Sequence, residues 1–159
     1  MSLAINKENN EKPKFKVAEE DIICYKVVIN RRIPLFSWIT RNKYRTPYFG
    51  MNVRCNKLYE EHGDDCGNRT IDDLVQPGNI FWFVNCGVFH MFKDIKFARM
   101  DAEALNKCND ELYPLGLHKY RVIKAIIPKG AYYIEGHCSG MSSAFAPAIA
   151  SNKVIYKEL

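Results

Sequence analysis

The apolar positions along this chain fall into short runs typical of strands and one stripe typical of a helix. Residues 21–30, DIICYKVVIN, are rich in β-branched side chains and bounded by polar residues, which predicts a strand near the centre of a sheet. A second run, YRVIKAII at 120–127, leads through the turn residues 128–130 into AYYIEG at 131–136. Because a tight turn between strands favours antiparallel pairing, we expect these two runs to form a hairpin.

The window NIFWFVNCGVFHMF, residues 79–92, is the most apolar stretch of the chain. Gly87 interrupts its middle, so the pattern fits either one bent strand or two strands that meet at residues 85–87. If residues 88–92 are a strand, then Val88, His90 and Phe92 share one face.

One helix is predicted after this window. Asp94 is a good capping residue for a helix that continues to about residue 109. The apolar positions within it are spaced three, four and three residues apart, as on a helix face that packs against a core. They are Ile95, Ala98, Ala102 and Leu105.

Strands outnumber helices, so the predicted fold class is α+β: a mostly antiparallel sheet with one main helix over about 94–109. Residues 1–18 are polar and mixed in charge and are expected to be a loose N-terminal tail. Residues 19–159 then form a single domain, a usual size for one hydrophobic core. The core is expected to contain Val27, Ile29, Phe81, Phe83, Ile95, Leu105, Ile123 and Ile126.

The six cysteines are interpreted as free, mostly buried thiols. No apolar run reaches the length of a membrane span, and the first residues lack the pattern of a secretory signal. We therefore expect a soluble, cytoplasmic protein without a membrane partner, a setting in which disulfides are rare. Zinc sites use closely spaced ligand pairs, and no CxxC pair occurs, so we predict no metal site. We also predict no bound cofactor, and nothing in the pattern indicates an oligomeric state.

Charge is concentrated in one segment. Residues 31–59 contain seven basic residues and no acidic one, whereas the rest of the chain has 16 basic and 18 acidic residues. The same segment is rich in aromatic residues. Basic groups that neutralise phosphates, interleaved with rings that stack on bases, are typical of single-strand binding. The candidate binding residues are Trp38, Arg41, Lys43, Arg45 and Tyr48.

An ordinary interpretation of this segment stays open, namely a solvated basic face above an aromatic core. In the binding interpretation the partner is nucleic acid or another polyanion. The chain has none of the short catalytic signatures, such as a phosphate-binding glycine loop, HExxH or GxSxG. We therefore expect a binding or interaction module more than an enzyme.

Two residues are weak catalytic candidates. His90 lies in an apolar run, where an imidazole is either a hydrogen-bonded core residue or a general base. Glu135 lies near the end of a predicted strand, where an acidic residue is usually solvated surface.

An ordered series of short motifs resembles a group of small uncharacterised phage and bacterial proteins. It consists of CYKVV (24–28), TPY (46–48), KLYEE (57–61), GVFHMF (87–92), VIKAIIPKG (122–130) and IASNKVIYKE (149–158). Phe89 is inserted between Gly87-Val88 and His90 relative to the G-x-H pattern of that group. The resemblance implies one domain and brings no function.

The late segment AIIPKGAYYIEG, residues 125–136, is similar to the strand-turn-strand of mono-ADP-ribosyltransferases. That resemblance implies an alternative function, an NAD-using enzyme centred on Glu135 and His90. The sequence departs from that family in two places. Its first strand carries Tyr25 and Lys26 instead of Arg or His, and Tyr133 stands where the family has Glu or Gln.

Overall fold

The computed structural model describes residues 3–8, 10–31, 43–45, 52–54, 59–62, 70–84, 87–112, 118–138 and 145–159. The elements, in chain order, are β1 (Leu3–Asn6), β2 (Lys16–Val17), β3 (Ile22–Arg31), β4 (Lys43–Arg45), β5 (Asn52–Arg54), β6 (Tyr59–His62), the 3₁₀ helix η2 (Ile71–Leu74), β7 (Val75–Pro77), β8 (Phe81–Val84), β9 (Phe89–Phe92), α1 (Ile95–Leu112), β10 (His118–Ile127), β11 (Tyr132–Cys138), β12 (Ala146–Ser151) and β13 (Lys153–Lys157).

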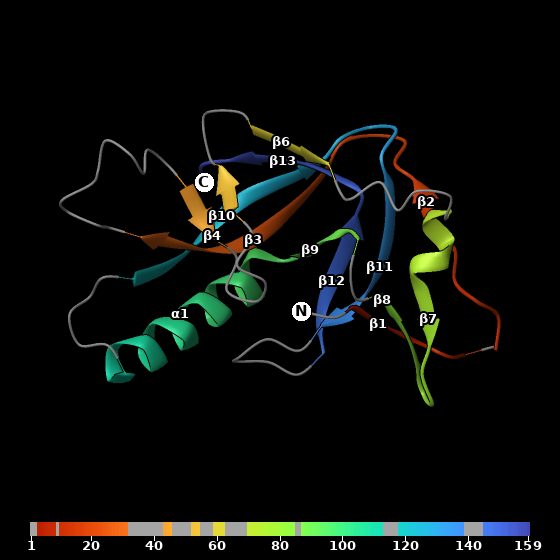
Figure 1. Ribbon diagram of the computed structural model, residues 1–159, viewed down its shortest axis with the longest axis horizontal. Helices are drawn as coiled ribbons and strands as arrows, with labels where there is room; N and C mark the ends of the chain where they lie inside the picture. The colour runs from red at the N-terminus through yellow and green to blue at the C-terminus, as the bar shows by residue number, and fades with distance from the viewer. Residues whose placement is uncertain are drawn as a thin grey trace.

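The strands form one sheet in which every described pairing is antiparallel. The order is β6-β13-β10-β3-β9-β12-β11-β1-β8-β7, with β2 paired to β11, β4 to β3, and β5 to β4. Helix α1 packs against β10 and β3 on one face of this sheet (Figure 1). The prediction of a mostly antiparallel sheet with one main helix is therefore confirmed for the part of the chain that is described.

Helix α1 follows the predicted cap and stripe. A carboxylate oxygen of Asp94 accepts a hydrogen bond from the backbone N–H of Lys96 at 2.8 Å, which satisfies one of the free donors of the first turn. Ala98 and Ala102 are buried. Asp101, which shares this helix face, is also buried, at 1 % exposure, although a carboxylate there was not expected.

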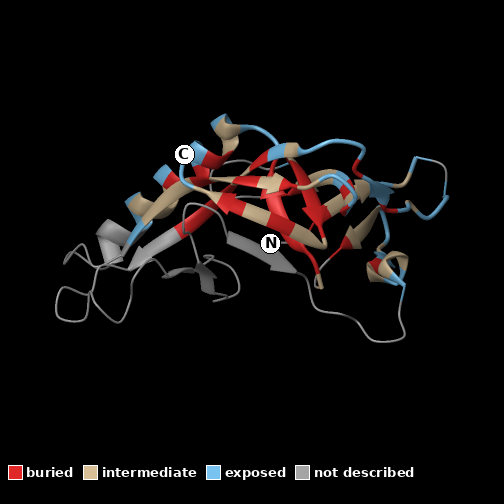
Figure 2. Cartoon of the chain, turned by 90° about the horizontal axis from the view of Figure 1, so that it is seen from above, coloured by how far each residue is buried: buried red, intermediate tan, exposed pale blue. Residues whose placement is uncertain are grey.

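Buried side chains lie on both faces of the sheet, with exposed residues at the turns and the outer surface (Figure 2). Val27 belongs to the core on the α1 face, whereas Cys24 and Val28 belong to the core on the opposite face. Of the predicted core residues, Val27 and Ile123 are buried and the side chain of Ile29 is not described. The half-buried ones are Phe81, Phe83, Ile95, Leu105 and Ile126.

The apolar window at 79–92 forms two strands that do not pair with each other. Strand β8 pairs with β1 and β7, and β9 pairs with β12 and β3. Gly87 adopts a φ of 84° between them, a backbone conformation that favours glycine.

The predicted hairpin at 120–136 is wrong. Strand β10 pairs with β3 and β13, whereas β11 pairs with β12, β1 and β2. The turn between them is held by a preceding segment instead: the N–H of Lys129 donates to the Asp21 carboxylate at 2.9 Å, and the N–H of Gly130 donates to the Ala18 carbonyl at 2.8 Å. The turn residues therefore lead the chain from β10 to β11 without pairing the two strands that they connect.

The N-terminal segment also differs from the expected loose tail. Strand β1 pairs with both β8 and β11, and the Leu3 side chain is fully buried in the core on the α1 face. The apolar residues of LAIN supply enough buried surface to order this segment. Among the described residues, no helix has both the length and the apolar character needed to span a membrane.

The close passage of β1 over β11 gives a testable prediction. A Cβ at position 136 would lie 2.5 Å from the Ala4 carbonyl oxygen, a backbone atom that cannot move aside cheaply. We expect Gly136→Ala to lower the free energy of unfolding by about 1–3 kcal/mol, as in other overpacked sites, measured by denaturant titration. In a chain lacking residues 1–6, the same substitution should have little effect on the free energy of unfolding of that shortened chain, because the clashing atom is absent. An unchanged unfolding midpoint in the full chain would contradict the packing described.

Candidate functional site

The predicted basic binding site is described only in part. Trp38, Arg41 and Tyr48 lie outside the described residues. Lys43 and Arg45 lie on β4, whose backbone pairs with β3 on one side and β5 on the other. The structure therefore fixes the register of two of the five candidate residues.

This register brings three basic positions onto one face of the β4–β5 pair. Lys43 is directly opposite Arg54, and Arg45 is opposite Asn52. Successive positions along a strand alternate between the two faces of the sheet, so these four positions share one face. Tyr44 and the position paired with it are on the other face. We call the positions of Lys43, Arg45 and Arg54 the basic face.

The basic face is on the α1 side of the sheet. Arg45 is paired with Ile29 of β3, and Ile29 is paired with Tyr120 of β10. Ile29 is two residues from Val27, which belongs to the core that α1 covers. Paired positions share a face, so Arg45 and Tyr120 are on the same side, about 10 Å apart at two strand spacings.

A second pair of cations occurs on this side. Lys124 of β10 is directly opposite Lys157 of β13, and both side chains are half-buried. Val122 lies two residues before Lys124 on the same strand and packs on the α1-side core. Arg121, by contrast, is on the other face and forms an ion pair with Glu158 at 2.7 Å.

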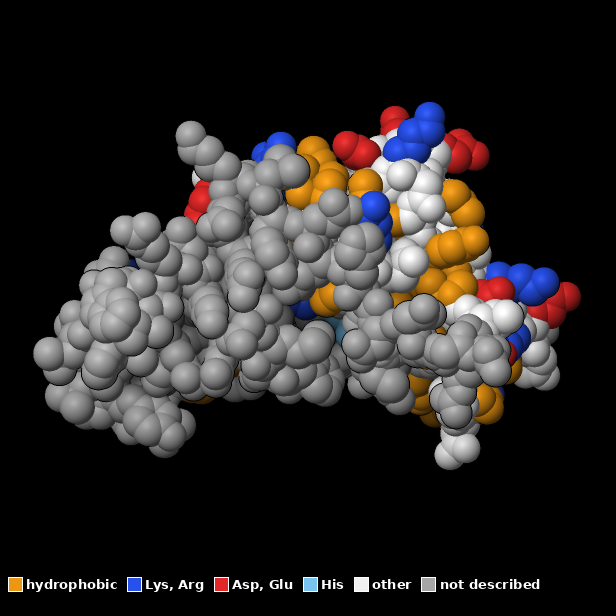
Figure 3. Space-filling model, turned by 45° about the horizontal axis from the view of Figure 1, so that its top comes forward, with side chains coloured by type: hydrophobic (Ala, Val, Ile, Leu, Met, Phe, Trp, Pro, Cys, Tyr) orange, Lys and Arg blue, Asp and Glu red, His pale blue; other side chains and the backbone are white. Residues whose placement is uncertain are grey.

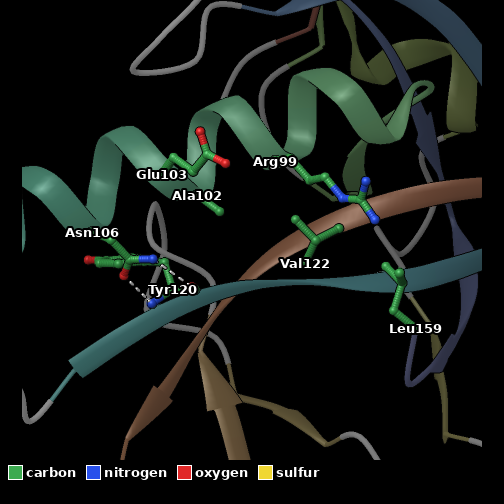
Figure 4. A pocket seen from close by; sticks show the side chains of 7 residues that line it. All are labelled: Arg99, Ala102, Glu103, Asn106, Tyr120, Val122 and Leu159. Carbon is green, nitrogen blue, oxygen red and sulfur yellow. Dashed lines mark hydrogen bonds between the residues drawn. The ribbon is translucent and has the colours of Figure 1, made fainter.

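A cavity of about 330 Å³ lies on the same side of the sheet as this lysine pair, between α1 and β10 (Figure 4). Arg99 and Glu103, both exposed, come from the edge of α1. The lining residues are Arg99, Ala102, Glu103, Asn106, Tyr120, Val122 and Leu159. We call this cavity the α1 pocket.

Two hydrogen bonds hold the walls of the α1 pocket together. The Asn106 amide nitrogen donates to the Tyr120 carbonyl at 2.9 Å, and the Tyr120 N–H donates to the Asn106 side-chain oxygen at 2.7 Å (Figure 4). Asn106 thereby replaces a neighbouring strand on the edge of β10, beyond the end of β13. Burial raises the pKa of the Tyr120 phenol above its ordinary value, so this ring stays neutral.

His90 is buried, as expected for a core histidine. It lies on β9, is 5 % exposed, and shares a face with Val88 and Phe92, which belong to the core on the α1 side. Its carbonyl oxygen accepts a hydrogen bond from the Lys26 ammonium at 2.7 Å.

Glu135 lies on the opposite face. It is paired with Ile149 of β12, and Ile149 is paired with Met91 of β9, and both partners belong to the core away from α1. Its carboxylate forms an ion pair with Lys93 at 2.6 Å, with 46 % of the glutamate side chain exposed. His90 and Glu135 therefore project from opposite faces and do not converge on one cleft.

Glu135 does line a second cavity of about 340 Å³ on its own face. The lining residues are Ile5, Asn6, Glu8, Lys93, Glu135, Gly136, His137 and Pro147. Side chains of both charge signs meet there, so the cavity does not select strongly for anions or cations. Figure 3 shows the same mixture on the face that it presents, where basic and acidic groups both border the hydrophobic surface of the described residues.

Two buried charged residues were missed by sequence reasoning. Lys26 is 8 % exposed although it carries an ammonium group, and Asp101 is 1 % exposed. The only signal for Lys26 was its position inside the apolar run of 21–30, where a charged side chain needs a polar partner.

The two buried thiols, Cys24 and Cys138, do not have the character of nucleophiles. Burial raises the pKa of Cys24 from 9.0 to about 12, partly offset by the nearby Lys26 charge. Burial, and then the Asp101 carboxylate, raise the pKa of Cys138 to about 12. Cys108 is exposed. In the part of the chain that is described, no group of three or more His, Cys, Asp or Glu residues is placed to hold a metal ion.

Comparisons of the chain with known protein families, curated proteins and solved structures gave no match. The resemblances to small phage and bacterial proteins and to ADP-ribosyltransferases therefore stay predictions from short motifs.

The thiol environments predict selective alkylation. At pH 8 a thiol with a pKa of about 12 is ionised in only about one molecule in ten thousand, and the thiolate is the reactive form. We expect iodoacetamide to label Cys108 in the native protein and to leave Cys24 and Cys138 unmodified, as mapped by peptide mass spectrometry. All three should react after denaturation. Rapid native labelling of Cys24 would contradict its burial.

The buried ammonium group gives a second prediction. Lys26→Met keeps the length of the side chain but removes the ammonium donor, so the buried hydrogen bond to the His90 carbonyl is lost. We expect the free energy of unfolding to fall by about 1–3 kcal/mol, with faster hydrogen exchange of the β9 amides. Lys16→Met, at an exposed position on β2, is the matched control and should be close to neutral. Equal effects of the two substitutions would refute a special role for Lys26.

Proposed function

We propose that this protein is a binding module for single-stranded nucleic acid, whose phosphates contact the basic face of the β4–β5 pair. The observation that carries the proposal is the register that sets Lys43 opposite Arg54, with Arg45 on the same face. These residues belong to a segment of 29 positions, 31–59, with seven basic residues and no acidic one.

The energetics of paired like charges support an anionic ligand. Two cationic residues at directly opposite strand positions destabilise the pair that they form. A phosphate chain removes this repulsion, and the release of its condensed counterions adds a favourable term. The segment contains no acidic residue that could neutralise these cations.

Aromatic composition favours nucleic acid over other polyanions. The segment contains Phe36, Trp38, Tyr44, Tyr48, Phe49 and Tyr59. Stacking of bases on such rings is tolerant of sequence and is worth about 1–3 kcal/mol per base. The alternative of an ADP-ribosyltransferase has no comparable support, because its two candidate residues lie on opposite faces of the sheet.

The test is the salt dependence of binding to a fluorescent single-stranded oligonucleotide. The triple variant Lys43→Ala/Arg45→Ala/Arg54→Ala should weaken binding at low salt. It should also reduce the slope of log affinity against log salt by about 0.7 for each phosphate that the protein no longer neutralises. The matched control is Lys12→Ala/Lys14→Ala/Lys16→Ala, which removes the same charge from exposed positions outside the segment.

The outcome separates a local site from general attraction by net charge. A flatter slope in the β4–β5 triple variant alone supports the proposal. Equally weakened binding in both triple variants would show that only net charge matters, and the absence of binding by the unmodified protein at low ionic strength would remove the proposal altogether.

A further inference from the structure

The α1 pocket combines three features that together fit one class of ligand. Its floor is apolar, formed by Ala102, Val122 and Leu159. Its rim carries Arg99 and Glu103, one helical turn apart on α1. Its walls are fixed by the paired hydrogen bonds between Asn106 and Tyr120, so a ligand would meet a preorganised site.

The lysine pair lies close to this pocket in the chain, because Lys124 and Lys157 are each two residues from a lining residue, Val122 and Leu159. Lys124 follows Val122 on the same face of β10, at about 7 Å along the strand. Lys157 is the last residue of β13, two residues before Leu159. The four-carbon stem of a lysine covers that distance. In the described residues neither lysine is ion-paired with an acidic side chain, unlike Arg121 and Lys93 on the other face.

We propose that the α1 pocket binds one nucleotide unit, with its phosphate at Lys124, Lys157 and Arg99 and its base on the apolar floor. The cavity of about 330 Å³ is at the small end of ligand sites, which suits a single nucleotide. A bare phosphate would leave the apolar floor in contact with water, and an apolar ligand would make no use of the two lysine charges.

Glu103 on the rim selects among bases. Its carboxylate accepts hydrogen bonds, so it favours a base with amino and ring N–H donors. Guanine offers both an amino group and a ring N–H, whereas uracil lacks the amino group. GMP is therefore expected to bind more tightly than UMP. This site does not depend on the basic face, because different residues form it.

The experiment is isothermal titration of the full-length protein with GMP, UMP, guanosine and inorganic phosphate. We expect GMP to bind at least about tenfold more tightly than either guanosine or phosphate, because the two subsites act together. Lys124→Gln/Lys157→Gln should weaken GMP binding by about tenfold or more. Lys119→Gln/Lys129→Gln, at exposed positions on β10 and in the turn after it, is the matched control and should leave it unchanged.

A second variant tests the base contact without disturbing the core. Glu103 is exposed, so Glu103→Gln should keep the fold and reduce the preference for GMP over UMP. Phosphate binding as tightly as GMP, or an equal weakening in the two lysine double variants, would overturn the proposal. The proposal would also be overturned if the Lys43/Arg45/Arg54 triple variant lost GMP binding while the Lys124/Lys157 double variant kept it. That result would show that GMP binds at the basic face.

Binding of GMP without any binding of the oligonucleotide would support this pocket and remove the proposed single-strand function. A 5′-phosphorylated oligonucleotide that competes with GMP, where the same strand without the phosphate does not, would identify a strand end as the source of the nucleotide. Free nucleotide is the source if neither strand competes.

Discussion

Lys26 Nζ donates a hydrogen bond to the His90 carbonyl oxygen where β3 and β9 meet, and these two strands share one paired position, Tyr25 with Phe92. On one side of this junction are β6, β13, β10 and β3, and on the other are β9, β12, β11, β1, β8 and β7. The ammonium group supplies a donor that a longer strand pairing would have supplied from the backbone. An unpaired carbonyl in this position would be costly, because water is excluded on both faces.

The alternation of side chains across this sheet decides which residues act together. The face that α1 covers contains His90, Tyr120, Val122 and Lys124, together with the basic positions of the β4–β5 pair. Glu135 projects from the other face, because successive residues of a strand alternate between the two faces of the sheet. Chemistry that needs His90 and Glu135 in one cleft is therefore disfavoured by the pairing, whereas the proposed anion recognition on the α1 face would use residues that are far apart in the chain.

Local sequence patterns predicted which segments form strands and the helix better than they predicted which strands pair with each other. The β-branched runs gave the strands at 22–31 and 118–127, and the spacing of Ala98 and Ala102 gave the helix, because these signals depend on neighbours in sequence. The pairing of β10 with β3 joins residues that are far apart in the chain, and the turn after β10 does not encode it. The burial of Asp101 and Lys26 was not predicted, because charged residues are usually exposed. The clustering of basic residues in 31–59 was visible in the sequence. That three of them share one face became clear only from the register of the strand pairing.

The side chain of Asn106 also blocks an edge of the sheet at which a strand from another molecule could pair. Past the end of β13, the outer edge of β10 would present a free N–H and C=O at Tyr120, which is the arrangement that recruits strands from other molecules. By occupying both groups, Asn106 closes this edge with an amide from the helix instead of a further strand. Removal of that amide would reopen a short template for intermolecular β pairing, so this position contributes to keeping the chain from aggregating as well as to the shape of the pocket.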